Sequence, residues 1–438
     1  MSTGRRGGVA VPAALVGTAT AAFVAAVLWG RDLEGTSRAL HLGASPFYGT
    51  WTWRLGWRVA PAALVAAALL VAWPRLTERL GWRSALLASG VASMAWSVAL
   101  ATVDGWDRLW SPLVTKWEYL PLARTIGDPG RFLAEFLDRL EHLPTHVRGH
   151  PPGAVLAFWV IDRVMGSDLG VAVVVVALGA STAPAALIAL DRLAGRSVAR
   201  RALPFAGLAP AVVWIATSPD ALFAAIVAWA VALGAVAVTA SGRGRDVAAV
   251  GCGVLAGVAL ACTYGAVLFL APLWGLAIVA VVRDRARPGR PLAVLGGAAA
   301  GLVAVLGLLA AGGFWWFDGL HATREEYLAG VAPDRPLRYF AFANLVVLAV
   351  ACGPATVAAL GRWRRHGATL VASTLVGVLV ADLSGYTKGE VERIWLPFVP
   401  FLVLATAWLP TGRSSRRAWL GGQLVVALAV QVALRSHW

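Results

Sequence analysis

Apolar stretches alternate with short polar segments from one end of the chain to the other. A bilayer crossing needs roughly 20 apolar residues as helix, because backbone polar groups inside the membrane must bond to one another. We place thirteen such helices along the 438 residues. They lie at 9–29, 57–73, 84–102, 170–190, 203–217, 221–240, 247–262, 265–282, 291–312, 338–360, 367–384, 394–411 and 418–434. The pattern predicts an all-α polytopic membrane protein with about thirteen transmembrane helices.

One further apolar stretch, 153–165, is expected not to cross the membrane. It follows Pro151-Pro152, is shorter than a bilayer crossing requires and contains Asp162 and Arg163. If it crossed, every later arginine cluster would move to the opposite side. We expect a half-penetrating or interfacial helix, and a short true span stays open as the alternative.

Composition adds an orientation to this pattern. The chain is 59% hydrophobic and 14% charged, and basic residues concentrate in every second loop. These predicted inner segments hold 21 of the 38 Lys and Arg residues but only four of the 23 Asp and Glu residues. Basic loops stay in the cytoplasm, so Arg5 and Arg6 place the N-terminus there. The net charge of +15 is therefore an orientation signal and does not indicate nucleic-acid binding.

The predicted outer segments contain surface helices but no separate soluble domain. In the large outer loop 103–152, Asp128 and Pro129 have the residue types of an N-cap and a first helical position. Apolar residues then recur at helical spacing, which predicts an amphipathic juxtamembrane helix at about 129–142. A second surface helix is expected at about 319–330.

Three outer segments carry the candidate chemistry. Glu118 and Tyr119 precede His150-Pro151-Pro152 by about 32 positions, Asp220 lies in a turn formed by Ser218-Pro219-Asp220, and a late segment combines Lys388, Glu390, Glu392 and Arg393. Charges close to the bilayer are costly, so their presence favours a function. The alternative is that Glu390 and Glu392 are solvated neighbours of Lys388 and Arg393.

This order of motifs resembles the integral-membrane glycosyltransferases of the GT-C superfamily, especially the protein O-mannosyltransferases and aminoarabinose transferases. That family has an acidic residue early in a large outer loop, then surface helices, then His-Pro-Pro or Lys-Pro-Pro at the next membrane helix. Glu118 to Gly153 is similar in order and spacing. Pro219-Asp220 resembles the family's hairpin carboxylate, and Arg393 to Pro400 resembles its late Leu-Pro-x-x-Pro segment.

The resemblance covers about 104–230 and 384–405 and implies one GT-C-like transmembrane domain over residues 1–438. The chain departs from the family in two respects. Glu118 stands where the family usually has Asp, and the loop follows the third span instead of the first. Asp104 or Asp107, and Asp32 or Glu34 in the loop 30–56, therefore stay open as alternative bases.

The resemblance implies that a sugar moves from a polyprenyl-phosphate donor to a glycan, lipid or protein acceptor. Such a transfer needs a carboxylate to take the acceptor's proton and cations to stabilise the leaving phosphate. We expect the base among Glu118, Asp104 and Asp107. The expected substrate-binding residues are Tyr119, His150, Asp220, Lys388, Glu390 and Arg393.

This reaction needs no nucleotide site, and a divalent metal ion held by Asp104 and Asp107 stays open as a cofactor. His142, His146 and His150 recur at helical spacing, but Pro144 and Gly149 interrupt the helix, so we expect no metal site there.

We therefore expect an inverting glycosyltransferase in the cytoplasmic membrane, with its active site on the outer face. The rival function is a lipid-linked sugar flippase or other transporter, which predicts broken helices and ionisable residues at mid-membrane depth.

Overall fold

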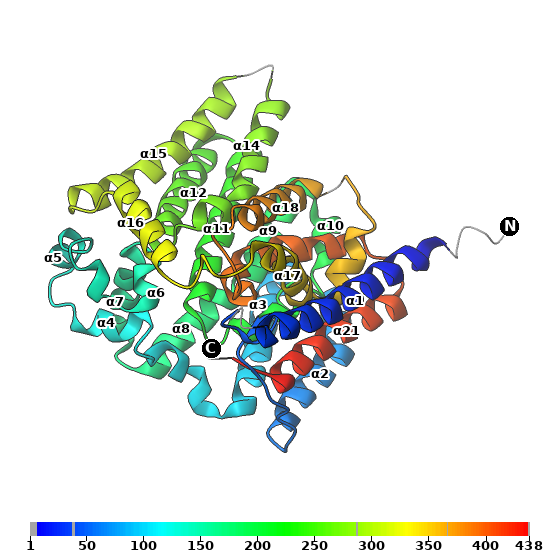
Figure 1. Cartoon of the computed structure of the whole chain (residues 1–438). Coiled ribbons are helices and arrows are strands. Elements are labelled where there is room, and N and C mark those ends of the chain that lie inside the picture. Colours follow the sequence, from blue (N-terminus) through cyan, green and yellow to red (C-terminus); the bar gives the residue numbers. More distant parts are fainter. Residues whose placement is uncertain (1–6, 37–39, 286–287, 366, 437–438) are drawn as a thin grey trace.

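The computed structural model describes residues 7–36, 40–285, 288–365 and 367–436. Nine helices in this part of the chain are long and apolar enough to cross a membrane. The molecule is mostly helical and fits the predicted all-α, multi-pass membrane protein (Figure 1). Arg5 and Arg6, which orient the first predicted span, lie outside the described residues.

The longer helices follow most of the predicted spans. They are α1 (Gly7–Gly35), α2 (Val59–Arg79), α3 (Trp82–Ala101), α8 (Asp168–Ala180), α9 (Thr182–Ala194), α11 (Pro219–Thr239), α12 (Gly242–Cys262), α14 (Ala271–Arg283), α15 (Gly289–Ala311), α17 (Leu337–Leu360), α18 (Ala368–Leu383) and α21 (Arg413–Ala433). α12 packs along both α11 and α15, and α17 bends at Gly353, where φ is 78° and a proline follows.

Short elements make up the connections. The large outer loop contains η1 (Thr102–Asp104), η2 (Trp106–Leu109), η3 (Ser111–Val114), α4 (Tyr119–Thr125), α5 (Pro129–Ala134), η4 (Leu140–His142) and α6 (Thr145–Arg148), and the short helix α7 (Gly153–Met165) follows it. Elsewhere lie α10 (Arg196–Ala202), η5 (Pro210–Trp214), α13 (Ala266–Phe269), α16 (Trp316–Ala329), α19 (Val391–Ile394), η6 (Leu396–Phe398), α20 (Val399–Val403) and η7 (Leu404–Trp408). Two antiparallel pairs join β1 (Gly43–Ala44) to β2 (Phe47–Tyr48) and β3 (Thr50–Trp51) to β4 (Leu434–Arg435).

Segments that the charge pattern assigns to the cytoplasmic side contact one another. Arg413 pairs with Glu78 at 2.8 Å, and Arg200 donates to the carbonyl oxygen of Leu80 at 2.9 Å. Arg290 donates to the carbonyl oxygen of Ala240 at 2.8 Å. These contacts link loops that are 50 to 335 residues apart in sequence, which gathers the basic loops at one end of the helix bundle.

The predicted outer segments gather in the same way. Arg148 pairs with Glu326 of α16 at 2.9 Å, and the Tyr327 hydroxyl donates to the carbonyl oxygen of Gly385 at 2.9 Å. α4, α5, α7 and α16 lie together on one side of the molecule (Figure 1). The second surface helix, expected at 319–330, is confirmed as α16.

The prediction of a transmembrane helix at 203–217 is wrong. This segment contains turns and only the short η5, because Pro204 and Pro210 lack backbone donors and Gly207 adopts a φ of 74°. Every residue in it except Gly207 is buried. It starts beside Trp73, whose ring nitrogen donates to the carbonyl oxygen of Pro204, and it ends at Thr217, which donates to the carbonyl oxygen of Leu109.

The predicted span 394–411 is also irregular. Residues 391–408 form four short helical elements, α19, η6, α20 and η7, instead of one regular helix, and Pro397 and Pro400 remove two backbone donors. The segment is nevertheless almost completely buried. Irregular backbone at membrane depth is tolerated where it is enclosed by protein, and both irregular segments meet that condition.

The juxtamembrane helix predicted at 129–142 is shorter than expected. The Asp128 carboxylate accepts from the backbone nitrogens of Gly130 and Arg131, as predicted for an N-cap, but α5 ends at Ala134. Turns replace the helix until η4. The apolar residues at 132, 133, 136 and 140 are buried against the protein, so packing within the loop has overridden the helical periodicity.

The short helix α7 reproduces the stretch 153–165 and lies along α4. Asp162, near its C-terminal end, pairs with Arg124 of α4 at 2.8 Å, and Arg163 donates to the carbonyl oxygen of Ile126 at 3.4 Å. The C-terminal end of α7 therefore contacts the large outer loop from which the helix starts, which favours the interfacial placement over a crossing.

Candidate functional site

A buried ion cluster lies where α11 and α19 begin. Asp220 stands in the first turn of α11 after Pro219, and Arg393 belongs to α19. The Arg393 guanidinium donates to the Asp220 carboxylate at 2.7 Å and to the Glu390 carboxylate at 3.0 Å. Asp220 and Arg393 are 4% and 5% exposed. We call Asp220, Glu390 and Arg393 the Arg393 centre.

Glu390 has an unusual backbone conformation. Its φ is 59°, in the left-handed region that side chains other than those of Gly, Asn and Asp adopt rarely. It precedes α19, and its side chain folds back onto Arg393 three residues later. This side chain is 21% exposed, whereas that of Asp220 is 5% exposed. Glu390 is thus the more accessible of the two carboxylates that bind Arg393.

Glu118 is a second buried carboxylate. It lies immediately before α4, is 3% exposed, and its Oε1 lies 2.9 Å from Nδ1 of His146. Its other oxygen, Oε2, has no hydrogen-bond partner among the residues that the structure describes. A buried carboxylate oxygen that receives no hydrogen bond destabilises the folded protein. This atom is therefore suited to accept a proton, or a hydrogen bond from a hydroxyl group, of a ligand.

Tyr119 and His150 both donate hydrogen bonds to the same backbone carbonyl, that of His146. The Tyr119 hydroxyl donates to the carbonyl oxygen of His146 at 3.4 Å, and His150 Nδ1 donates to it at 2.8 Å. The rings of Tyr119 and His150 pack edge to face at 5.7 Å between centroids. We call Glu118, Tyr119, His146 and His150 the Glu118 cluster.

His150 is neutral at physiological pH. Burial lowers its pKa to about 4, although the charge of Asp220 acts in the opposite direction. Because a carbonyl oxygen can only accept, the hydrogen lies on Nδ1, and Nε2 remains an acceptor.

The Glu118 cluster and the Arg393 centre share one electrostatic environment. Burial raises the pKa of Tyr119 well above its usual value, and the charges of Glu118 and Asp220 raise it further, whereas Arg393 lowers it. The predicted residues Glu118, Tyr119, His150, Asp220, Glu390 and Arg393 therefore come together from three distant parts of the chain. Their combination of buried carboxylates, one arginine and a neutral imidazole can accept a proton and bind an anionic, hydroxyl-bearing ligand.

Two of the other predicted acids have different surroundings. Asp104 forms an ion pair with Arg54 and accepts from the side-chain amide of Gln431 at 3.3 Å. Arg54 also donates to the carbonyl oxygens of Gln431 and Leu434, so Asp104 is part of a contact between the first outer loop (30–56) and the end of α21. Asp107 is exposed on η2.

The remaining candidates are also outside the two clusters. The Lys388 amine donates to the carbonyl oxygen of Ala332 at 2.8 Å, so this predicted substrate-binding residue contacts the loop after α16. Asp32 is exposed on α1, and Glu34 accepts from the Ser45 hydroxyl at 2.7 Å.

Three residues near the site, His146, Glu392 and Tyr48, are absent from the expected catalytic and substrate-binding residues. His146 orients Glu118, yet no sequence signal separates it from the neighbouring His142. Glu392 is completely buried, so the alternative that it is a solvated neighbour of Lys388 is wrong. Its Oε1 accepts from the backbone nitrogen of Tyr48 at 2.9 Å, which brings the first outer loop next to Arg393.

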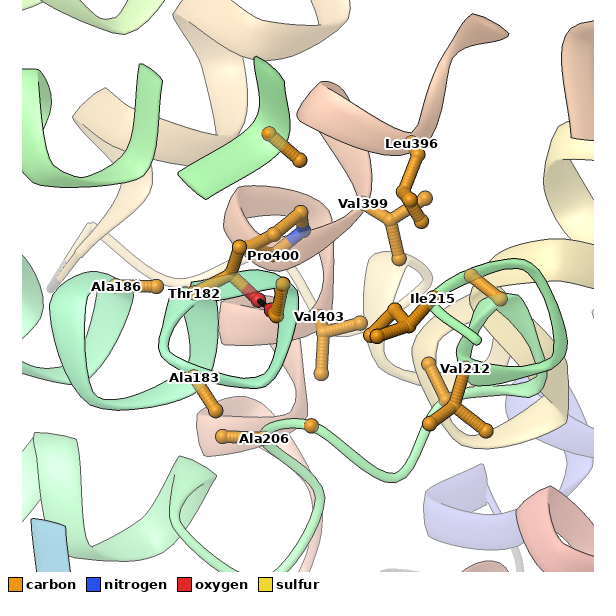
Figure 2. Close-up of a pocket in the computed structure, with 15 residues that line it drawn as sticks. Thr182, Ala183, Ala186, Ala206, Val212, Ile215, Leu396, Val399, Pro400 and Val403 are labelled. Atoms are coloured by element: carbon orange, nitrogen blue, oxygen red, sulfur yellow. Dashed lines mark hydrogen bonds between the residues drawn. The ribbon is translucent and has the colours of Figure 1, made fainter. Parts of the chain in front are cut away.

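An apolar pocket lies between the two irregular segments. Figure 2 shows side chains from α9, from 203–217 and from 396–403 converging on it, among them Thr182, Ile215 and Val403. The Thr182 hydroxyl donates to the carbonyl oxygen of Gly179 at 2.7 Å and is thereby satisfied. The pocket extends to Leu396, three positions after Arg393, so a chain bound there would be apolar and would end close to the Arg393 centre.

The described residues contain no group of three or more His, Cys, Asp or Glu side chains that could hold a metal ion. As expected from Pro144 and Gly149, His142 and His146 belong to separate short elements, η4 and α6.

Comparison with known proteins leaves the GT-C resemblance without independent support. No family model matches the chain, and no curated protein matches its sequence. The function therefore has to be argued from the site.

Proposed function

We propose that the chain is an inverting glycosyltransferase of the GT-C type that takes a sugar from a polyprenyl-phosphate donor on the outer face of the membrane. One observation carries the proposal: the buried carboxylate of Glu118 has an oxygen without a hydrogen-bond partner in the described part of the chain, and it shares its surroundings with the buried Arg393. The first can act as a general base, and the second can bind a phosphate.

In this mechanism Glu118 takes the proton of the acceptor hydroxyl. The acceptor oxygen forms a bond to the anomeric carbon while the bond from that carbon to the phosphate oxygen breaks. Attack from the face opposite the phosphate inverts the anomeric centre. His146 holds Glu118 in position through its Nδ1 contact at 2.9 Å.

Arg393 stabilises the phosphate as negative charge develops on it. Two carboxylates occupy the guanidinium in the structure, and the donor phosphate would have to replace one of them. Asp220 is the more deeply buried partner and fixes one edge of the guanidinium, so the more exposed Glu390 is the carboxylate that gives way.

The apolar pocket supports a substrate with an apolar chain. Its lining between α9 and the two irregular segments offers a place for isoprenoid carbons close to Leu396. A free nucleotide sugar has no group that would use such a lining.

We further propose thirteen membrane crossings with the N-terminus in the cytoplasm. The segregated contacts of basic and acidic loops support this topology. Segment 203–217 then crosses without forming a helix, because it leads from Trp73 at the basic end to Leu109 in the outer loop.

The test is sugar transfer by membranes that contain the protein. Radiolabelled polyprenyl-phosphate mannose, arabinose and glucose are supplied together with a cell-envelope extract as acceptor. We expect the wild type to consume one of these donors and Glu118→Gln to consume none at equal abundance. Glu135→Gln, which changes a more exposed carboxylate of the same loop, is the matched control. Equal consumption by empty membranes and by the wild type would refute the proposal.

A lipid-linked sugar flippase is the second candidate. The two irregular segments and the buried Arg393–Asp220 pair are features that transporters also use. Reconstituted vesicles separate the two functions. A flippase moves the labelled lipid between leaflets without cleaving its sugar, whereas the transferase releases polyprenyl phosphate.

A further inference from the structure

The first outer loop folds into a small hairpin next to the Arg393 centre. β1 pairs with β2, so that Gly43 lies opposite Tyr48, and β3 pairs with β4 at the end of the chain. Phe47 is 1% exposed and stacks on Trp214 of the irregular segment 203–217, with ring centroids 6.1 Å apart. We call residues 43–51 the outer hairpin.

Arg335 connects the residues just before the outer hairpin to the loop that precedes α19. Its guanidinium donates to the carbonyl oxygens of Leu40 at 3.0 Å, His41 at 3.3 Å and Lys388 at 2.6 Å. One side chain therefore bridges the segment before β1 and the segment before α19. The hairpin therefore has two attachments. Arg335 holds the segment before β1, and Phe47 packs on Trp214.

The third attachment lies at the site itself. The backbone nitrogen of Tyr48 donates to Oε1 of the buried Glu392 at 2.9 Å, and Glu392 adjoins Arg393 in the chain. The Tyr48 side chain is half-buried and packs against the apolar cluster that contains Leu42 and Phe340. Burial and the charge of Glu390 raise the pKa of the Tyr48 phenol, while Arg335 and Arg393 lower it. The phenol is therefore protonated at neutral pH and lies within electrostatic range of the Arg393 centre.

We propose that Tyr48 is a substrate-binding residue whose hydroxyl contacts the sugar of the donor. The inference rests on the proposed transferase function. If the phosphate replaces Glu390 on Arg393, the sugar attached to that phosphate lies next to the arginine, close to the point where the backbone of Tyr48 attaches the outer hairpin to Glu392. A phenol both donates to and accepts from hydroxyl groups, which suits a sugar better than a phosphate. The first two helices and their loop then contribute directly to donor recognition.

The experiment compares Tyr48→Phe with wild type, using whichever of the three polyprenyl-phosphate sugars the wild type consumes. Tyr386→Phe, which removes the hydroxyl of an exposed outer tyrosine, is the matched control. We expect Tyr48→Phe to raise the KM for the donor about 10-fold, as for the loss of one ligand hydrogen bond. We expect kcat to change less than KM, and Tyr386→Phe to match the wild type.

Inhibition by undecaprenyl phosphate, which lacks the sugar, identifies the contact. If Tyr48 binds the sugar, the inhibition constant is the same for the wild type and Tyr48→Phe. An equal rise in KM and in this inhibition constant would place the contact at the phosphate and overturn the inference. An unchanged KM would also overturn it while leaving the transferase function intact. A wild type that neither consumes a donor nor binds undecaprenyl phosphate would refute both.

Discussion

Arg393 and Asp220 form an ion pair at 2.7 Å between segments that are 173 residues apart in sequence. Both side chains are shielded from water, because only 6% of the Arg393 side chain and 5% of the Asp220 side chain are exposed. The pair joins the first turn of α11 to α19, and it therefore fixes the relative positions of two elements on which the site depends.

Breaking this pair is expected to destabilise the protein strongly. Removing Arg393 leaves the buried Asp220 carboxylate without a counter-charge, which costs about 3–5 kcal/mol. Removing Asp220 should cost less, because Arg393 keeps its ion pair with Glu390. Asp220→Ala and Arg393→Ala should each lower the midpoint of thermal unfolding in detergent. The double variant should lose less than the sum of the two, with an interaction energy of about 0.5–3 kcal/mol. Strictly additive losses would show that the two charges do not stabilise each other.

Replacing Glu118 by its amide is expected to lower the transfer rate, whereas replacing Asp104 by its amide is expected to lower stability. Glu118→Gln removes the proposed base and should lower kcat by about 10²- to 10⁴-fold with little effect on stability. Asp104→Asn weakens the contact with Arg54 and should destabilise the fold by about 1.5–3 kcal/mol. Its transfer rate per folded molecule should stay near that of the wild type.

The exposed Asp107 provides the control for this comparison, since Asp107→Asn should change neither quantity. Transfer rates normalised to folded protein, together with unfolding midpoints, give the answer. A normal kcat in Glu118→Gln, combined with a lost kcat in Asp104→Asn, would move the base to the other carboxylate.

Glu390→Gln is expected to tighten donor binding. In the proposed mechanism the Glu390 carboxylate competes with the donor phosphate for Arg393, and the amide removes that negative charge. An electrostatic contribution of about 1 kcal/mol corresponds to a KM roughly 5-fold lower. Steady-state kinetics with the identified donor measures this change. A markedly higher KM would mean that Glu390 binds the substrate and does not compete with it.

Stability should fall in mild acid because of His150. Burial holds its pKa at about 4 in the folded protein, below the ordinary value of 6.5. Between these values the unfolded chain binds a proton that the folded chain does not, so stability decreases as the pH falls from 6.5 towards 4. The slope from this group is at most about 1.4 kcal/mol per pH unit.

The matched variants are His150→Asn and His142→Asn, because His142 is exposed at the surface of the same loop. Unfolding midpoints between pH 4.5 and 7.5 should depend less on pH in His150→Asn than in the wild type. His142→Asn should keep the dependence of the wild type. Identical pH profiles for all three proteins would contradict the assignment.

Two glycines of α15 should respond differently to the same substitution. A side chain at Gly301 would collide with the backbone of α12 at Val250, whereas Gly307 has open space around it. Gly301→Leu should therefore separate α12 from α15 and cost about 1–3 kcal/mol or more. Gly307→Leu should stay within about 0.5 kcal/mol of the wild type. Unfolding midpoints and the yield of monodisperse protein provide the measurement.

Helices that pack by regular apolar faces were predictable from the sequence. α12 and α15 are long apolar helices at the positions that the pattern gives, because their length and composition suffice. Segment 203–217 has the same composition but contains Pro204, Gly207 and Pro210, and only its burial among neighbouring helices stabilises it as an irregular segment. Composition cannot distinguish the two cases.

The site was predictable where charge stands out against an apolar background. Asp220 and Arg393 are conspicuous for that reason, and the structure brings them together. His146 and Tyr48 have no such signal, since their roles come from tertiary contacts with Glu118 and Glu392. Asp104 had the expected residue type in the expected loop, but Arg54, which it binds, lies in a different loop.

The irregular segment 203–217 also bears on how the chain is synthesised. A stretch with so few internal backbone hydrogen bonds cannot enter lipid alone, because its polar groups would meet hydrocarbon. The partners that enclose it include α21, which is synthesised much later than this segment. The segment therefore has to wait in the insertion machinery, or in a temporary position at the membrane surface, until α21 has emerged from the ribosome.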